Sequence, residues 1–303
     1  DMKVPLNYLK TEGACLTPNG AKFKNDSQGF LPEMMEKMYN ERVVFKKRMI
    51  KAKQQYERTK NPKLVKEIAR CHNIQWSKKI ALNSAYGAVG NQYFRYYDVR
   101  QASGITTAGQ FIIRFIESKV NEYLNRILQT HDKIDYIVAS DTDSIYVTLD
   151  KLVEKTCEGK TNDQICNFID KVVGSRIEPF LEKCFGELSD YTNAFKNCMV
   201  MKREVIADKG IWVAKKRYML NVLDEEGVRL SEPKLKLMGI EAVKSSTPQV
   251  CRGKIKEAIK IIMSKEQSDL HKFVADFKKE FLQMSAEQIS FPRSCNNIRK
   301  YRD

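Results

Sequence analysis

Two acidic side chains stand one residue apart at Asp141 and Asp143, on either side of Thr142. The segments before and after them, residues 135–139 and 144–149, are rich in β-branched and aromatic residues, which predicts a β-hairpin with the acidic pair at its turn. Two carboxylates and a carbonyl on a tight turn suit a hard cation such as Mg²⁺. Acidic residues are also common as solvated turn formers. The apolar strands favour the metal interpretation, because charges raised on a buried hairpin are costly without a cation.

A second set of polar residues recurs at helical spacing. Lys79, Asn83 and Tyr86 share one face of a predicted helix, and Gly87 follows them directly. An ammonium, an amide and a phenol at this spacing suit contacts with the phosphate, sugar and base of a nucleotide.

Two further cations, Arg42 and Lys46, stand four residues apart on another predicted helix. Two basic helices that face each other make a site for a triphosphate. The ordinary alternative is a pair of solvated charged faces.

The elements that position these residues are predicted from periodicity. Residues 30–60 form a helix with Pro32 in its first turn, and Asn61-Pro62 breaks the chain before a second helix that ends near Gly87. The pair forms an antiparallel hairpin with a strongly basic surface. Further helices are predicted at residues 101–129, 161–187 and 247–263, with strands at 198–224 and 228–238. The last helix is expected to start with Thr247 as cap and Pro248 in its first turn.

Length and charge restrict the function classes. The chain has 303 residues, enough for two or three lobes, and its net charge of +15 with a pI near 9.3 indicates a polyanionic partner, with nucleic acid as first candidate. No apolar run reaches the length of a membrane span, and no membrane partner is expected. The eight cysteines form no C-x-x-C pair and indicate reduced thiols in a cytosolic protein.

The motifs, in their order, resemble those of family B DNA polymerases, and more closely the replicative polymerases of T4-like bacteriophages. The resemblance covers nearly the whole chain. It rests on Lys79-x-x-x-Asn83-Ser84-x-Tyr86-Gly87, Phe94-Arg95-Tyr96-Tyr97-Asp98, Asp141-Thr142-Asp143-Ser144, Lys215-Lys216-Arg217-Tyr218, and Met238-Gly239-Ile240-Glu241 followed by Ser245-Ser246-Thr247-Pro248.

The resemblance implies an α+β fold with an antiparallel palm sheet, packed helices, a two-helix fingers hairpin and a partial helical thumb. Residues 1–29 and 89–240 would belong to the palm, 30–88 to the fingers and 241–303 to the start of the thumb.

It also implies roles for individual residues. Asp141 and Asp143 would be catalytic and bind metal. The nucleotide would contact Arg42, Lys46, Lys79, Asn83, Tyr86 and Gly87. The DNA-binding residues would be Ser144, Glu204, Lys215, Lys216, Arg217 and Tyr218. For the Lys215–Tyr218 stretch, a basic strand edge kept soluble by its charge is an equally simple explanation.

The activity implied is nucleotidyl transfer from a dNTP to a primer 3′-hydroxyl with two Mg²⁺ ions. The implied partners are primer–template DNA, dNTP, an upstream polymerase segment and a sliding clamp, in the cytoplasm of a bacterial host.

The sequence also departs from the family. It contains no match to the D-x-x-S-L-Y-P-S motif that carries another metal-binding Asp, and no exonuclease. The fingers hairpin is shorter than in T4-like relatives, Ser140 replaces a common Gly, and Lys202 replaces a common Asp. We therefore expect the isolated chain to be inactive. The alternatives are a non-catalytic DNA-binding module, one half of a split polymerase, or an unrelated Mg²⁺-dependent phosphotransferase, which would not explain the motif at Lys79.

Overall fold

The computed structural model describes residues 5–130 and 134–301. These residues form two compact units. The first contains the described residues up to Glu204 together with Glu225–Arg229, and the second contains Val205–Asp224 and the described residues from Leu230 onward.

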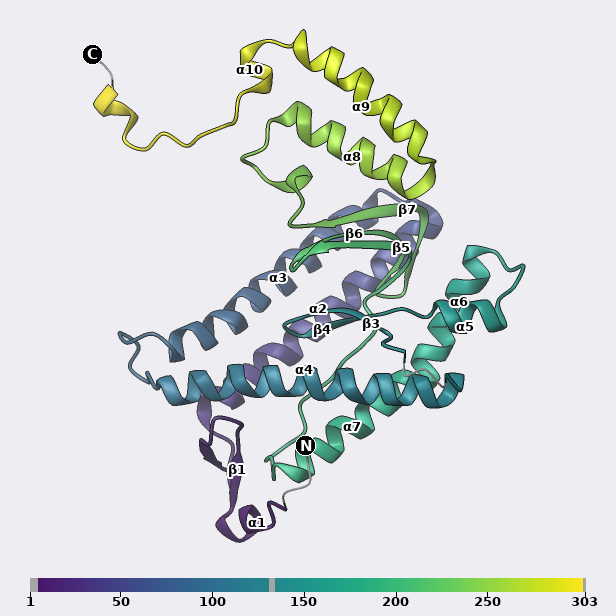
Figure 1. Cartoon of the computed structure of the whole chain (residues 1–303). Helices are drawn as coiled ribbons and strands as arrows, with labels where there is room; N and C mark the ends of the chain where they lie inside the picture. Colours follow the sequence, from purple (N-terminus) through teal and green to yellow (C-terminus); the bar gives the residue numbers. More distant parts are fainter. Residues whose placement is uncertain (1–4, 131–133, 302–303) are drawn as a thin grey trace. The chain divides into compact units, whose positions relative to one another are not determined.

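The helical hairpin of the first unit is confirmed. Helices α2 (Phe30–Thr59) and α3 (Lys63–Val89) run side by side, as Figure 1 shows. Lys60 ends α2 in a left-handed conformation with φ 50°, and the Asn61 side chain accepts a hydrogen bond of 3.0 Å from the Lys63 amide. One prediction at the ends needs correction, because Pro62 stands just before α3 and not in its first turn. The predicted end near Gly87 agrees with the observed end at Val89.

Helix α4 (Val99–Leu128) carries the main core of the first unit. Asp98 caps it by accepting a hydrogen bond of 2.9 Å from the Arg100 amide. Apolar residues spaced four apart on one face are buried, and α7 (Glu178–Tyr191) packs against them. This cluster contains Ile116, Val120, Leu124, Leu128, Tyr136, Leu181, Cys184 and Phe185.

The predicted β-hairpin is also confirmed, although its first strand begins at Ile137. Strands β3 (Ile137–Asp141) and β4 (Ser144–Val147) pair antiparallel, with Ile137 opposite Val147 and Asp141 opposite Ser144. A register shift lies between Ile137 and Ala139. Ile145 and Val147 pack against the α4–α7 core, so α4 supports the hairpin.

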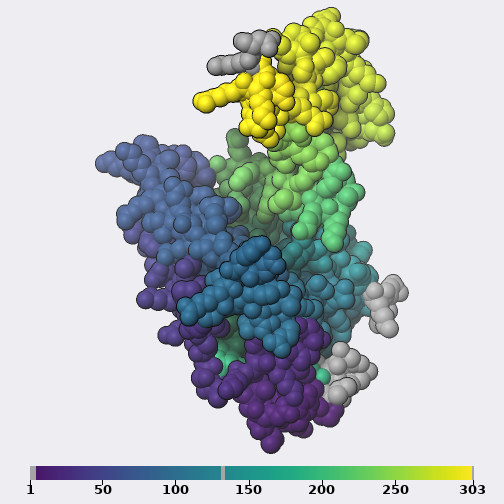
Figure 2. Space-filling view, turned by 90° about the vertical axis from the view of Figure 1, so that its left-hand side faces the viewer, coloured from purple at the N-terminus to yellow at the C-terminus, as the bar shows by residue number. Residues whose placement is uncertain are grey.

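The remaining elements of the first unit are short. The first elements of the described residues are α1 (Tyr8–Glu12), β1 (Ala14–Leu16) and β2 (Lys22–Lys24), where β1 and β2 pair antiparallel. Figure 2 shows this N-terminal segment, in purple, beneath the start of α4, and the Asn19 side chain donates to the Arg100 carbonyl over 3.1 Å. Helices α5 (Asp150–Thr156) and α6 (Asn162–Val172) follow, and a π-helical turn at Val173–Ile177 joins α6 to α7. Residues 161–187 are therefore helical as predicted.

The second unit is built on a three-stranded sheet in the order β5-β6-β7. Its strands are β5 (Val205–Ala214), β6 (Arg217–Glu225) and β7 (Val228–Met238). Because two-residue turns join neighbouring strands, the sheet is an antiparallel meander. Residues 198–204, predicted as strand, lie before β5. Met219, Ile240 and Ala242 pack with Ile259 and Met263 of α8 in the core.

Helices follow the sheet. A 3₁₀ turn at Glu241–Val243 leads to α8 (Gln249–Ser264), α9 (Gln267–Leu282) and α10 (Ala286–Ile289), and a 3₁₀ turn at Ile298–Tyr301 follows them. Helix α8 starts one residue after Pro248, and no side-chain hydrogen bond caps it, so the predicted Thr247 cap is wrong.

The α+β class is confirmed. In the described ranges the strands form three sheets, β1-β2, β3-β4 and β5-β6-β7, and the assignment of a palm sheet among them stays a prediction. Every described helix is too short or too polar to span a bilayer.

Candidate functional site

The acidic turn is closed by its own backbone and side chains. Thr142 adopts a left-handed conformation with φ 57°, and the Asp143 amide donates to the Asp141 carbonyl over 2.7 Å. The Ser144 hydroxyl donates to the same carbonyl over 3.1 Å, and the Thr142 hydroxyl donates to the Asp141 carboxylate over 3.0 Å. The Asp141 carbonyl is therefore used inside the turn.

Asp141 is half-buried and Asp143 is exposed at this turn. Carboxylate oxygens are the ligands that Mg²⁺ prefers. Among the residues with described positions, no three His, Cys, Asp or Glu side chains gather as a metal site. The role of the two aspartates as magnesium ligands stays a prediction. The remaining ligands would have to come from phosphate, water or another carboxylate.

Helix α3 presents a polar face where the sequence predicted it. Lys79, Asn83, Tyr86 and Gly87 are all exposed. The Lys79 ammonium lies 5.5 Å from the centre of the Trp76 ring, close enough for a cation–π interaction. A methyl group placed on Gly87 would meet no atom within 4 Å, so a flat ligand could approach the helix backbone there.

Helix α2 supplies two cations in different states. Arg42 is half-buried, and its buried Nε has no hydrogen-bond partner. A buried donor without a partner costs about 1–3 kcal/mol. One turn further along, the Lys46 ammonium lies 2.5 Å from the Glu226 carboxylate.

The register of the hairpin brings cations from both helices to one level. The Lys78 ammonium lies 2.5 Å from the Glu41 carboxylate, and Arg48 pairs with Glu67 further along. Arg42 and Lys79 directly follow the residues of the first pair in the sequence, so they lie near the same height on opposite helices. The nearness of Lys79 to Asp141 and Asp143, which belong to the same unit, stays a prediction.

The basic motif of the second unit lies at a turn. Lys215 and Lys216 connect β5 to β6 and are exposed, and Lys216 has a left-handed φ of 60°. The buried Nε of Arg217 has no hydrogen-bond partner, although another nitrogen of its guanidinium pairs with Glu241.

The aromatic residue of this motif differs from the surface position that the sequence suggested. Tyr218 is only 5% exposed and lies with its ring centre 6.2 Å from that of Trp212. Met219, the next residue of β6, packs in the core with α8, so alternation places Tyr218 on the opposite face of the sheet, where its ring lies near Trp212. Its contact with DNA stays a prediction that its burial does not support.

The segment before β5 is held by ion pairs. Lys202 lies 2.9 Å from Glu178, and Arg203 lies 2.6 Å from Asp170. Glu204 is exposed, and its carbonyl accepts a hydrogen bond of 2.6 Å from the Glu226 amide.

Sequence reasoning missed Glu226 as the partner of Lys46. The available signal was only an acidic residue before a glycine at a predicted turn, which many solvated turns share. It also missed Trp76 beside Lys79, which stands three residues before the lysine on the same helix face.

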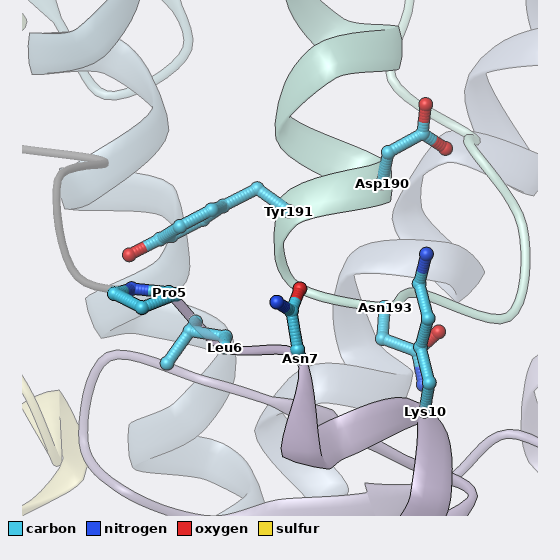
Figure 3. A pocket seen from close by; sticks show the side chains of 7 residues that line it. All are labelled: Pro5, Leu6, Asn7, Lys10, Asp190, Tyr191 and Asn193. Carbon is cyan, nitrogen blue, oxygen red and sulfur yellow. The ribbon is translucent and has the colours of Figure 1, made fainter.

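A pocket lies near the start of the described chain, with a volume of about 300 Å³. Figure 3 shows Tyr191 and Asp190 from the end of α7 above Asn7 and Lys10. Asn193, also on its wall, donates to the carbonyls of Leu9 and Ala14. These bonds fasten α1 to the segment after α7, which indicates a structural role for the polar lining.

Comparisons with known proteins agree with these features. The sequence pattern of DNA polymerase family B matches residues 5–294. The chain is 37% identical to the DNA-directed DNA polymerase of Escherichia phage RB69, over 94% of this chain and 37% of that protein. It is 36% identical to the DNA-directed DNA polymerase of Enterobacteria phage T4, over 97% of this chain and 32% of that protein. A DNA polymerase of Pyrococcus glycovorans is 25% identical over 80% of the chain. The chain thus spans about a third of the length of its phage relatives.

Proposed function

Since the chain belongs to the family B DNA polymerases, we propose that it supplies the nucleotide- and duplex-binding part of a template-directed DNA polymerase of a phage replication system. The observation that carries the proposal is the Glu41–Lys78 pair at 2.5 Å, which brings Arg42 and Lys79 to one level of the basic hairpin. A triphosphate needs several cations at one place, and two antiparallel helices provide them without bending the chain.

In this proposal the segments keep the names that the resemblance gave them. Residues 30–88 are the fingers, residues 1–29 and 89–240 the palm, and residues 241–303 the start of the thumb. The uninterrupted α2–α3 hairpin supports the first name, and the β3–β4 hairpin on α4 supports the second. The paired helices α8 and α9 after the sheet support the third.

Each group has a chemical task in the reaction. The primer 3′-hydroxyl attacks the α-phosphorus of a dNTP, and pyrophosphate leaves. Arg42, Lys46 and Lys79 neutralise the triphosphate and hold it in line for this attack. On α3, Asn83 lines the nucleotide, and the exposed ring of Tyr86 lies beside the new base pair above the open backbone of Gly87.

Asp141 and Asp143 would hold Mg²⁺ together with ligands from outside their turn. When bound, two Mg²⁺ ions would supply positive charge against the attacking and leaving oxygens. Carboxylates from one turn face a metal pair from one side, so we propose that a further aspartate comes from an upstream polymerase segment that is separate from these 303 residues.

Duplex binding is assigned to cations that contact phosphates. These cations are Lys215, Lys216 and Arg217 at the β5–β6 turn. Ser144 and Glu204 of the first unit are also proposed to contact DNA, as the resemblance implies, but not as cations. The proposal includes a sliding clamp as partner and the cytoplasm of a bacterial host as the place of action, as the resemblance implies.

Template-directed nucleotide binding tests the proposal. Primer–template DNA would be bound to a Trp212→Phe variant of the chain with Mg²⁺, and each of the four dNTPs would be titrated while the fluorescence of the remaining Trp76 is followed. We expect the dNTP complementary to the template base to bind more tightly than the other three. Arg42→Gln and Lys79→Gln should each weaken its binding about tenfold, as loss of a charge-assisted contact of 1.5 kcal/mol would. Lys183→Gln, on α7, is the control.

The outcomes separate the proposal from its rival. A complex that binds DNA but takes all four dNTPs equally would identify a DNA-binding module without template direction. If the dNTP affinity is unchanged by both Arg42→Gln and Lys79→Gln, the basic hairpin is not the nucleotide site.

A further inference from the structure

Helix α2 is fastened to the turn between β6 and β7 at two points. The Lys46 ammonium lies 2.5 Å from the Glu226 carboxylate, and the Gln54 side chain donates to the Gly227 carbonyl over 2.9 Å. Glu226 and Gly227 lie in the same compact unit as the helix. We call these two contacts the Glu226 tether.

The turn that carries Glu226 has a defined shape. Glu226 and Gly227 have φ angles of 55° and 79°, the left-handed pair typical of a type I′ turn between two strands. The Glu226 amide also donates to the Glu204 carbonyl over 2.6 Å. Because the backbone is held at both sides, the carboxylate is presented to α2 instead of moving freely in solvent.

The ion pair is partly shielded from water. The Lys46 side chain is 32% exposed and the Glu226 side chain 23%. A carboxylate and a phosphate offer the same kind of charged oxygen to an ammonium group. One turn away on the same helix, the buried Nε of Arg42 has no hydrogen-bond partner. Of Arg42 and Lys46 on α2, Lys46 is therefore already neutralised by a carboxylate of the protein before a nucleotide binds.

We propose that Glu226 is a positioning residue that competes with the incoming triphosphate for Lys46 and holds α2 to the β6–β7 turn until the nucleotide displaces it. This inference rests on the proposed function, because it takes Lys46 as a triphosphate ligand. It adds a residue from the β6–β7 turn, far from the hairpin in sequence, to the control of nucleotide affinity.

The first test measures affinity. The chain would be titrated with dATP and, separately, with inorganic tripolyphosphate, at fixed Mg²⁺ and ionic strength. Glu226→Gln removes the competing charge and should tighten both ligands about two- to fivefold, the size expected of a partly exposed ion pair. Glu67→Gln is the matched control. Glu67 of α3 pairs with Arg48, which lies on α2 like Lys46, so this substitution also removes an ion pair to α2. It should leave both affinities unchanged.

A double substitution identifies the path of the effect. Lys46→Gln alone should weaken both ligands, and adding Glu226→Gln to it should change nothing further, because the competed cation is already absent. A second readout is hydrogen exchange of the amides in residues 225–229. It should rise in Glu226→Gln and in Lys46→Gln, and also in the wild-type chain when dATP is added.

Failure of this inference differs from failure of the proposed function. If Lys46→Gln weakens dATP binding but Glu226→Gln does not tighten it, competition by Glu226 is refuted while the nucleotide site stands. If Lys46→Gln does not change the affinity for either ligand, or if neither ligand binds any variant, Lys46 is not a triphosphate ligand. Both the competition by Glu226 and the proposed nucleotide site are then refuted. Unchanged hydrogen exchange at 225–229 in Lys46→Gln would show that the tether does not hold the turn.

Discussion

Lys78 on α3 and Glu41 on α2 pair at 2.5 Å across the helical hairpin. The hydrogen bond from Lys78 lowers the pKa of the Glu41 carboxyl below its ordinary value. The pair is solvent-accessible, so it contributes little stability by itself. Its main effect is to fix how α2 and α3 are aligned along their length, and this alignment brings Arg42 and Lys79 to a similar height on the two helices.

Gly239 is expected to tolerate no side chain. Its φ is 63°, and a methyl group there would lie 2.3 Å from the Lys216 carbonyl oxygen and 3.1 Å from Cγ of Arg217. Gly239→Ala should therefore destabilise the second unit by about 1–3 kcal/mol or more, measured by urea unfolding.

Gly253 provides the matched control for this substitution. It lies within α8 with no atom within 4 Å of an added methyl group. Gly253→Ala should be neutral or stabilise by about 0.5–1 kcal/mol, since alanine favours helix. Equal effects of the two substitutions would contradict the close approach of Gly239 to Lys216.

Glu241 is expected to titrate far below other glutamates. A hydrogen bond from Lys244, then its own backbone amide and the charge of Arg217, lower its pKa from 4.5 to about 2. A carboxyl with a lowered folded pKa contributes its stability above the unfolded pKa and loses it as the pH falls toward 2. Side-chain ¹³C NMR should place its midpoint near 2, and Lys244→Gln should raise the midpoint toward 4.5. Lys256→Gln, on α8, should leave it unchanged.

DNA binding by this chain is expected to be weak, nearly independent of sequence and steeply dependent on salt. The net charge of +15 and the exposed lysines at 215 and 216 indicate phosphate contacts. Each contact contributes about 0.9 to the slope of log affinity against log salt concentration. The double variant Lys215→Gln/Lys216→Gln should lower the slope by about 1 to 2 in anisotropy titrations, whereas Lys183→Gln should not. A slope near zero in the wild-type chain would refute a phosphate-dominated surface.

The isolated chain is expected not to extend a primer. Asp141 and Asp143 come from one turn and fit one side of a metal pair, and two-metal transfer needs carboxylates from both sides. Without the second side the dNTP would be misplaced, and small misplacements at such sites cost about a hundredfold in rate. The assay is extension of a labelled primer–template with dNTPs and Mg²⁺.

Asp143→Asn is the control for contaminating polymerase in this assay. Extension that persists in Asp143→Asn comes from a contaminant. Robust extension by the wild-type chain that this substitution abolishes would show that the 303 residues assemble a working metal site, and an external aspartate would then not be needed.

The local elements of this protein are encoded in neighbouring residues. Residues 33–59 contain neither Gly nor Pro, and Asn61-Pro62 interrupts the helical pattern, so the boundary between α2 and α3 follows from the sequence. The acidic turn follows equally from the two β-rich segments around it. The family was also recognisable from motifs, because their residue types, spacing and order occur together.

Other features depend on residues that only folding brings together. Gln54 and Gly227 are 173 positions apart, and neither carries a local signal for the other, so the Glu226 tether is visible only in the tertiary structure. The burial of Tyr218 was likewise decided by the packing of the second unit. Periodicity and caps act over a few residues and are therefore readable from sequence, whereas the partner of a charged side chain is chosen by the packing of the whole unit.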